Sequence, residues 1–263
     1  MSKAAIIAGL AAFIAHSAQA CAADLLPPAP SLDSPALRGR FASETGAYLR
    51  ADTSYGLLRT RSATSTFTAA VTAFQYDATD AGRAGMVSLG AGYRFSEFMR
   101  VDLTGEYRGS ARYSARTSYG CSGSRCSDLY SGSIQSSVLM ANVYGELGSW
   151  FDITPSVGFG AGLAHTTFAP MTLEAANGHD EGQSAQASQV RPSFALMAGA
   201  SWDLSSKLKL EAGYRYMTLG AARSGAISCT PAAGLCAGQV QQTGLAAHDL
   251  RIGLRYGLTN GDL

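Results

Sequence analysis

The sequence predicts an all-β protein, an eight-stranded antiparallel transmembrane β-barrel with short periplasmic turns and long extracellular loops. Three observations carry this prediction. The chain of 263 residues contains only 15% charged residues but 30 glycines, whereas ordinary soluble domains have about 25% charged residues and about 7% glycine. Apolar and polar residues alternate in segments of about ten residues, and the connections between these segments are short and long in turn.

The first element is an export signal. Residues 1–23 begin with a single lysine, continue with an uncharged apolar run and end with small residues at the cleavage positions, as secretory signal peptides do. The apolar run is too short to cross a bilayer, which takes about 20 residues. Cleavage after Ala20 and cleavage after Ala23 are both open, and Cys21 is also open as a lipoprotein cysteine. We expect an exported protein located in the cell outer membrane.

The remaining chain divides into three predicted parts. Residues 24–44 contain four prolines and are expected to form a flexible periplasmic leader. Residues 45–258 carry the alternating segments of the barrel, and residues 259–263 form a C-terminal tail. No segment after residue 23 has about 18 consecutive apolar residues, so no transmembrane helix is expected.

Four alternating segments lie in the first half of the barrel region. Residues 46–55 place leucine, alanine, threonine and tyrosine on one face, and arginine, aspartate and serine on the other. Residues 86–95 alternate valine, leucine, alanine, tyrosine and phenylalanine with serine, glycine and arginine. Residues 98–108 set valine, leucine, glycine and tyrosine against charged residues and threonine. Residues 136–147 show a weaker alternation. Period-two alternation predicts strands with one apolar and one polar face.

Four further segments follow in the second half. Residues 154–164 alternate apolar side chains with serine and glycine. Residues 194–204 set leucine, alanine and tryptophan against methionine, glycine, serine and aspartate. Residues 208–216 give the clearest pattern, with leucine and tyrosine opposite lysine, glutamate and arginine. Residues 249–256 alternate leucine, isoleucine and tyrosine with aspartate, arginine and glycine. The apolar faces would contact lipid, and the polar faces would point into the lumen.

The connections between the predicted strands alternate in length. Short turns are expected near residues 96–97, 148–149 and 205–206, and aromatic residues cluster at the strand ends, as at membrane interfaces. The long polar connections, which would face outward, are residues 57–83, 109–133, 165–190 and 221–245. An ordinary soluble β-sheet with core aromatics is the alternative, but its connections would not follow this strict alternation.

Charged residues on the polar faces predict a lumen filled by ion pairs, since charges with little solvent must be paired to be tolerated. Inward glycines would leave space for these long side chains. The basic candidates are Arg50, Arg94, Arg100, Arg108, Lys209, Arg215, Arg251 and Arg255. The acidic candidates are Asp52, Asp102, Glu106, Glu146, Asp203, Glu211 and Asp249.

The cysteines fall in two close pairs within the predicted loops. Cys121 with Cys126 and Cys229 with Cys236 are disulfide candidates, because short polar cysteine loops in exported proteins are typical of local disulfides. A metal site is the alternative, but no histidine lies at ligand spacing from either pair. We expect the bridges to fix loop tips more than the fold, since such short loops remove little entropy from the unfolded chain.

Several motifs in order carry a family resemblance: GAYLRADTSYG, GAGYRF, FMRVDLTGEYR, ITPSVGFGAG, KLKLEAGYRY and HDLRIGLRYG. They resemble the small outer-membrane immunogenic, porin-like β-barrel proteins of alphaproteobacteria, part of the eight-stranded group that includes the OmpA membrane domain. The resemblance covers residues 46–256. It implies an outer-membrane surface protein involved in envelope integrity and surface or host interaction, without identifying a ligand. Many such barrels end on an aromatic residue, whereas GLTNGDL follows Tyr256 here, so Tyr256 or Leu263 would serve the assembly machinery.

The sequence favours a non-enzymatic role. His165, His179 and His248 lack a triad pattern, and His248 and Asp249 would point to opposite faces of a strand. No GxSxG elbow, phosphate loop or HExxH motif occurs, so we expect no catalytic residue, cofactor or metal. The net charge of +1 gives no indication of the basic surface that is typical of nucleic-acid-binding proteins. Expected partners are outer-membrane lipid and lipopolysaccharide, the barrel assembly machinery, and a host or surface ligand at the loops. A small porin-like solute channel is the alternative function.

Overall fold

The computed structural model describes residues 45–66, 71–121, 124–175, 181–230 and 237–258. The predicted signal peptide, leader and C-terminal tail lie outside these residues. The described part is built from β-strands joined by turns and short connections. Among the described residues, no helix is long and apolar enough to span a membrane.

Eight strands close into a barrel through antiparallel pairing of each strand with the next. The ring closes because the last strand pairs with the first, with Tyr55 opposite Leu250. Closure pairs the backbone groups of every strand on both sides, which lipid requires. The strands of the ring are β1 (Gly46–Ser65), β3 (Arg83–Arg94), β4 (Met99–Cys121), β5 (Ser124–Glu146), β6 (Ile153–Phe168), β9 (Ala187–Asp203), β10 (Leu208–Arg223) and β12 (Gln241–Gly257).

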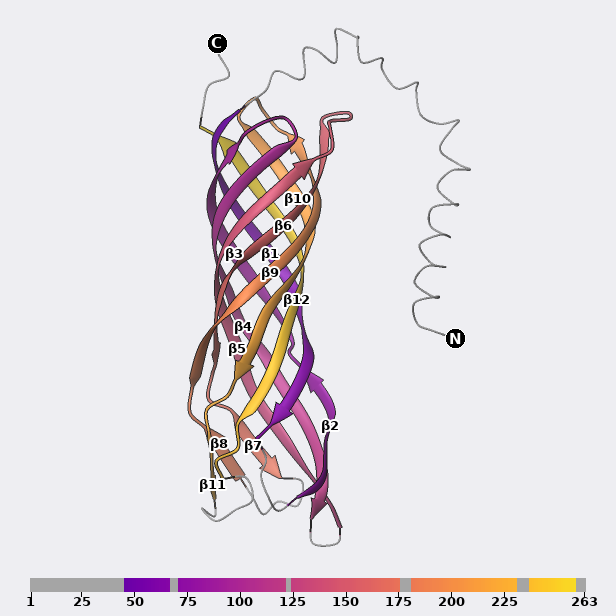
Figure 1. Ribbon diagram of the computed structural model, residues 1–263, viewed down its shortest axis with the longest axis vertical. Coiled ribbons are helices and arrows are strands. Elements are labelled where there is room, and N and C mark those ends of the chain that lie inside the picture. Colours follow the sequence, from indigo (N-terminus) through magenta and orange to yellow (C-terminus); the bar gives the residue numbers. More distant parts are fainter. Residues whose placement is uncertain (1–44, 67–70, 122–123, 176–180, 231–236, 259–263) are drawn as a thin grey trace, which may run out of the picture. The chain divides into compact units, whose positions relative to one another are not determined.

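Four short strands add to one end of the barrel, as Figure 1 shows. They are β2 (Thr72–Asp80), β7 (Thr172–Ala175), β8 (Glu181–Ser184) and β11 (Ile227–Thr230). β2 pairs with β4, β7 pairs with β5, and β8 joins β7 to β11. The tight turns lie at the opposite end, where Phe95 N donates to Met99 O at 3.0 Å and Leu204 N donates to Leu208 O at 2.9 Å. In the predicted topology this end would be periplasmic, and the end with the added strands would be extracellular.

Each of the eight predicted strands coincides with one strand of the ring to within one residue at the periplasmic end. The four long connections, however, are not mainly loops, because the strands continue into them. β4 and β5 are each 23 residues long, although about ten tilted residues cross a membrane. At about 3.3 Å per residue and a tilt near 40°, such strands rise roughly 55–60 Å, so the barrel extends far beyond the bilayer.

The two halves of these strands have opposite polarity. In the lower half of β4, Leu103 and Tyr107 are exposed on the outer face, while Glu106 is buried in the lumen. Beyond a register shift between Arg108 and Ala111, Tyr113 is buried inside and the outer face turns polar. The apolar outer face fits lipid and the polar one fits water, so the inversion marks the outer membrane surface. Because the sequence search sought apolar outer faces, it missed these extensions.

Candidate functional site in the barrel lumen

All the charged side chains that the sequence placed in the lumen lie within its membrane-spanning part, except Lys209 and Asp203 at the rim. Each of these residues takes part in an ion pair with another of them. They form one large group near the periplasmic end, one small group above it, and a pair at the rim. The local cause is the alternation of the strands, which turns every second side chain inward.

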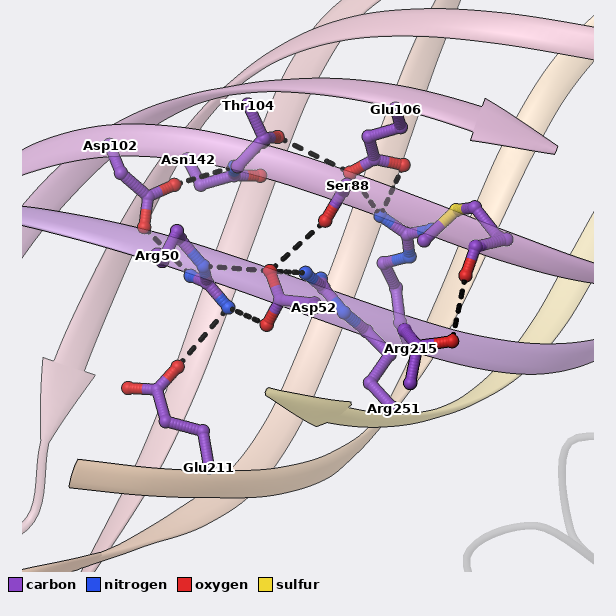
Figure 2. Close-up of polar contacts among 12 residues, drawn as sticks. Arg50, Asp52, Ser88, Asp102, Thr104, Glu106, Asn142, Glu211, Arg215 and Arg251 are labelled. Carbon is purple, nitrogen blue, oxygen red and sulfur yellow. Dashed lines mark hydrogen bonds and ion pairs between the residues drawn. The ribbon is translucent and has the colours of Figure 1, made fainter. Parts of the chain in front are cut away.

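Arg50 lies at the centre of the large group, as Figure 2 shows. Its guanidinium donates to both carboxylate oxygens of Asp52, from Nε at 3.0 Å and from Nη2 at 2.8 Å. Its Nη1 donates to Asp102 Oδ2 at 2.8 Å, and its Nη2 lies 3.1 Å from Glu211 Oε2. Because these residues come from β1, β4 and β10, their contacts tie together strands that are not neighbours in the ring.

Arg100 on β4 extends the large group toward the periplasm. Its Nε donates to Glu146 Oε1 at 3.1 Å, and its guanidinium carbon lies 3.8 Å from the centre of the Tyr144 ring. The Glu146 carboxylate also forms ion pairs with Arg94 Nη2 at 2.6 Å and with Arg255 Nη2 at 3.4 Å. A planar guanidinium can stack on an aromatic ring while it donates to carboxylates, which suits arginine rather than lysine to this place.

The small group joins β4, β10 and β12 in the middle of the barrel. Arg215 Nη1 donates to both oxygens of Glu106 at 2.6 and 2.8 Å, and its Nη2 donates to Asp249 Oδ2 at 2.9 Å. Arg108 Nη2 also donates to both oxygens of Asp249, at 2.8 and 2.7 Å. All four side chains are at most 1% exposed. The group therefore fills the cross-section of the lumen at this level.

A polar bridge connects the two groups across β4 and β5. Asn142 Nδ2 donates to Asp102 Oδ1 at 2.8 Å and to Thr104 Oγ1 at 3.2 Å. Thr104 Oγ1 in turn donates to Glu106 Oε1 at 3.2 Å (Figure 2). Because these bonds polarise one another in a dry interior, the network is expected to be more rigid than its separate pairs.

Inward glycines leave the space that this network occupies. A Cβ atom at Gly253 would collide with the carboxylate of Asp52, and a Cβ atom at Gly92 would lie 2.5 Å from the ring of Tyr48. A methyl group therefore does not fit at either position unless the ion pairs move. The surplus of glycine in the sequence is explained in part by this packing.

The remaining candidates lie at the edges of the network. Arg251 Nη2 contacts Asp52 Oδ2 at 3.1 Å within the large group. Lys209 Nζ pairs with Asp203 Oδ1 at 2.7 Å near the periplasmic rim, where the Asp203 side chain is 43% exposed. Solvent screens this rim pair, so it contributes little to stability.

A second, apolar plug fills the lumen beyond the membrane, and sequence reasoning missed it. Tyr113 and Phe168 meet edge to face with ring centres 5.1 Å apart. Tyr113 also hydrogen-bonds Thr243 at 3.0 Å, and burial raises the pKa of its phenol. Large side chains that share this plug and are under 2% exposed are Leu58, Tyr130, Ile134, Phe168, Met171, Leu173, Met217 and Leu219. The signal was present as continued alternation, but with the apolar side chains on the inward positions.

The cavities beside the ion pairs are small. One cavity of about 50 Å³ is lined by Arg50, Tyr144 and Glu211, and another of about 40 Å³ lies near Arg94 and Arg255 at the periplasmic end. Since one water needs about 10–15 Å³ of such volume, each cavity has room for a few waters at most. Neither cavity has room for a solute larger than a few waters.

The two histidines of the described residues, His165 and His248, are not paired with acidic side chains. His248 lies on the outer face, where its Nδ1 is 2.6 Å from the hydroxyl of Tyr214, while Asp249 points inward to its arginines. His165 lies on the outer face of β6, and His179 lies outside the described residues. Among the described residues, no group of three or more metal-ligating side chains is positioned to hold a metal ion.

The predicted disulfides involve atoms outside the described part. Cys126 lies in β5 and Cys229 lies in β11, but the side chain of Cys121 and all of Cys236 are outside it. In β5, Cys126 lies opposite Tyr119 of β4, two residues along the strand from the tip where Cys121 faces Ser124. Both bridges remain predictions.

Comparison with known proteins gives one family. A family model described as "Outer membrane protein beta-barrel domain" matches residues 8–257. An uncharacterized protein of Brucella abortus (strain 2308) is 29% identical over 211 residues, which cover 70% of this chain and 72% of the relative.

Solved structures of other proteins are similar to this chain. The outer membrane protein OprG from Pseudomonas aeruginosa is 14% identical, with a TM-score of 0.50 over 82% of this chain and 99% of that one. Neisserial surface protein A is also 14% identical, with a TM-score of 0.44 over 81% of this chain and 97% of that one. At such low identity the likeness concerns the fold alone.

Proposed function

Because the chain belongs to the outer membrane protein beta-barrel domain family, we propose that it is a non-enzymatic surface protein. It would contribute to envelope integrity and to surface or host interaction. In this proposal the ion-paired half of the barrel is a closed membrane anchor. The extension beyond the membrane is a rigid support that holds the extracellular connections away from the lipid.

The observation that carries the proposal is the filling of the lumen by two successive plugs. Arg215 and Glu106 are completely or almost completely buried at mid-height, and Tyr113 and Phe168 are buried above them. A channel needs a continuous hydrated path, whereas burial of charges against one another and of aromatic rings against one another excludes water. This filling argues against the porin-like alternative.

The membrane-anchor role is tested by conductance. Full-length protein would be reconstituted in planar bilayers after a gel shows different mobility with and without boiling, which marks a folded barrel. We expect no steady single-channel current, and an open general porin in the same lipid is the positive control. Steady currents from the heat-modifiable protein would overturn the closed-anchor proposal and favour a channel.

The surface role is tested by orientation and by loss of the protein. Cysteines introduced by Glu181→Cys at the extension and by Ser206→Cys at a tight turn would be labelled on whole cells with an impermeant thiol reagent. We expect labelling above the parent chain only at residue 181. Cells that lack the chain are expected to be more sensitive to detergent, and the full chain should restore resistance. Labelling at residue 206 alone, or unchanged sensitivity, would contradict the proposal.

A further inference from the structure

The outer wall of the barrel carries a hollow on its lipid-facing side, with a volume of about 590 Å³. Its lining residues form two rows across neighbouring strands. One row is Val87, Tyr107, Ser137, His165 and Val190, each opposite the next in the strand register. The second row is Leu89, Gly105, Leu139 and Leu163. We call this hollow the outer groove.

Two small residues, Gly105 and Ser137, leave the space of the outer groove. No atom lies within 4 Å of the place where a Cβ would stand on Gly105, and Ser137 is its neighbour in the other row. Around them Leu89, Leu139 and Leu163 are 54–70% exposed and form the walls. The lining of the groove is mainly apolar, with Ser137 and His165 as polar exceptions, so an acyl chain is the occupant that its chemistry fits.

Three arginines gather directly beyond the groove, around the bend at Gly82. Arg83 follows Gly82 and pairs with β1 at Leu57. Arg59 is the neighbour of Leu58, whose N–H donates to Gly82 O at 2.9 Å. A Cβ at Gly82 would lie 2.5 Å from the backbone oxygen of Arg112. The three backbones therefore meet at one point of the barrel wall.

These residues, Arg59, Arg83 and Arg112, are here called the arginine cluster. All three are exposed on the outer face, because buried Leu58, Ala84 and Tyr113 beside them point inward. Within the described part of the chain, no ion pair or hydrogen bond engages their guanidinium groups.

One carboxylate lies near the arginine cluster, since Asp80 accepts a hydrogen bond from Gly82 N at 3.0 Å. Asp77 lies farther out, where it accepts hydrogen bonds from Gln75 and Ser118. Two further exposed arginines follow along the same strands, Arg61 on β1 and Arg116 on β4. Positive charge therefore exceeds negative charge on this part of the outer face.

The outer groove and the arginine cluster share strands β3 and β4, where they lie at successive heights. Arg83 is four residues beyond Val87 on β3, which is about 13 Å along the strand. Arg112 follows Tyr107 on β4, beyond the level where the outer face changes from apolar to polar. The groove therefore lies at acyl-chain depth in the outer leaflet, and the arginines lie at the headgroup.

We propose that this face binds a phosphorylated glycolipid of the outer leaflet, with an acyl chain in the outer groove and phosphate on the arginine cluster. Arginine suits this role because its planar fork can donate two hydrogen bonds to one phosphate. Basic pockets beside membrane-spanning segments bind anionic lipid headgroups in the same way. The inference rests on the proposed orientation, with the extension facing outward.

The test measures lipid retention by native mass spectrometry of the full-length folded protein in detergent micelles. Diphosphorylated lipid A is the probe, and monophosphorylated lipid A and phosphatidylglycerol are the comparison lipids. We expect diphosphorylated lipid A to bind at least tenfold more tightly than either. Equal retention of the three lipids, or tighter binding of phosphatidylglycerol, would overturn the proposal.

Two variants separate the two halves of the site. The triple change Arg59→Gln, Arg83→Gln and Arg112→Gln is expected to abolish the preference for two phosphates. Gly105→Leu fills the groove from outside and is expected to weaken retention of all acylated probes at least tenfold.

Two control variants make the same kinds of change away from the proposed site. Arg125→Gln removes an exposed arginine at the far tip of β5, and Gly145→Leu adds a side chain to the lipid face away from the groove. Both should retain lipid A as the parent does, and every variant should keep its heat-modifiable mobility. If the site variants behave as the controls, the inference is wrong. The orientation and conductance measurements would still stand, so the two proposals fail separately.

Discussion

Replacing Arg215 by methionine is the sharpest test of the lumen network. The change removes a guanidinium that is 0% exposed and donates to Glu106 at 2.6 and 2.8 Å and to Asp249 at 2.9 Å. Asp249 keeps Arg108 as its partner, but among the described residues Glu106 keeps only the hydroxyl of Thr104. Removing one partner of a buried ion pair costs about 3–5 kcal/mol, because the other charge stays buried without compensation.

The measurement is the free energy of unfolding by urea in lipid vesicles, followed by tryptophan fluorescence and by gel mobility without boiling. With a slope of about 1–3 kcal/mol per molar urea, the expected loss lowers the midpoint by at least about 1 M. The control is Lys209→Met, which breaks the rim pair with Asp203. An exposed pair contributes about 0–1 kcal/mol, so the control should unfold almost as the parent does.

A second change distinguishes charge burial from loss of packing. Glu106→Gln in the Arg215→Met background removes the uncompensated carboxylate, so part of the lost stability should return. The reasoning is refuted if Arg215→Met unfolds no more easily than Lys209→Met. It is also refuted if Glu106→Gln adds its own full cost to that of Arg215→Met, because independent effects of this kind would mean that the two side chains are not coupled.

Three further predictions concern the extension and the glycines. Tyr113→Ala should cost about 3–5 kcal/mol of unfolding free energy in the same urea assay, as for other large-to-small changes in a packed core. Burial raises the pKa of Tyr113 and Tyr130, so the stabilising neutral form is fully present below the unfolded pKa near 10. The urea midpoint should therefore fall as the pH rises above about 10, and Tyr113→Phe should reduce that fall. Gly253→Val should prevent folding, since its side chain would collide with Asp52, whereas Gly145→Val should give a heat-modifiable barrel; equal yields would contradict this account.

The membrane-spanning half could be predicted from the sequence because each strand there alternates with a period of two and its outward residues must be apolar to face lipid. Every second residue must face lipid, so Leu103 and Tyr107 identify the outer face and place Glu106 inside. Once the inward face of each strand is assigned, every charged side chain on it is expected to have a partner of opposite charge in the lumen. Which carboxylate meets which guanidinium depends on the stagger of strands around the ring, and no single segment of sequence contains that information.

The extension escaped prediction for a physical reason. Ser131, Ser133 and Gln135 face outward on β5, so the outer face of this stretch is polar and looks like a loop when lipid exposure is assumed. Tyr130 and Ile134 continue the period of two, but in this stretch the apolar side chains point inward and the polar ones point outward. A search for alternation without a fixed polarity would have found both halves of the strand.

The polarity inversion also limits what the barrel can do. Below it, the outer face is anchored by lipid and the lumen is held by ion pairs. Above it, the lumen is held by aromatic and aliphatic packing, and the outer face is free to carry charge. An apolar plug is stable without lipid around the barrel, so the extension can keep its strands paired in water. The boundary is also where the arginine cluster can meet phosphate while the outer groove still meets acyl chains. Charged lipid recognition is therefore expected at the level of the inversion, and recognition of soluble or cellular ligands is expected at the tip of the extension.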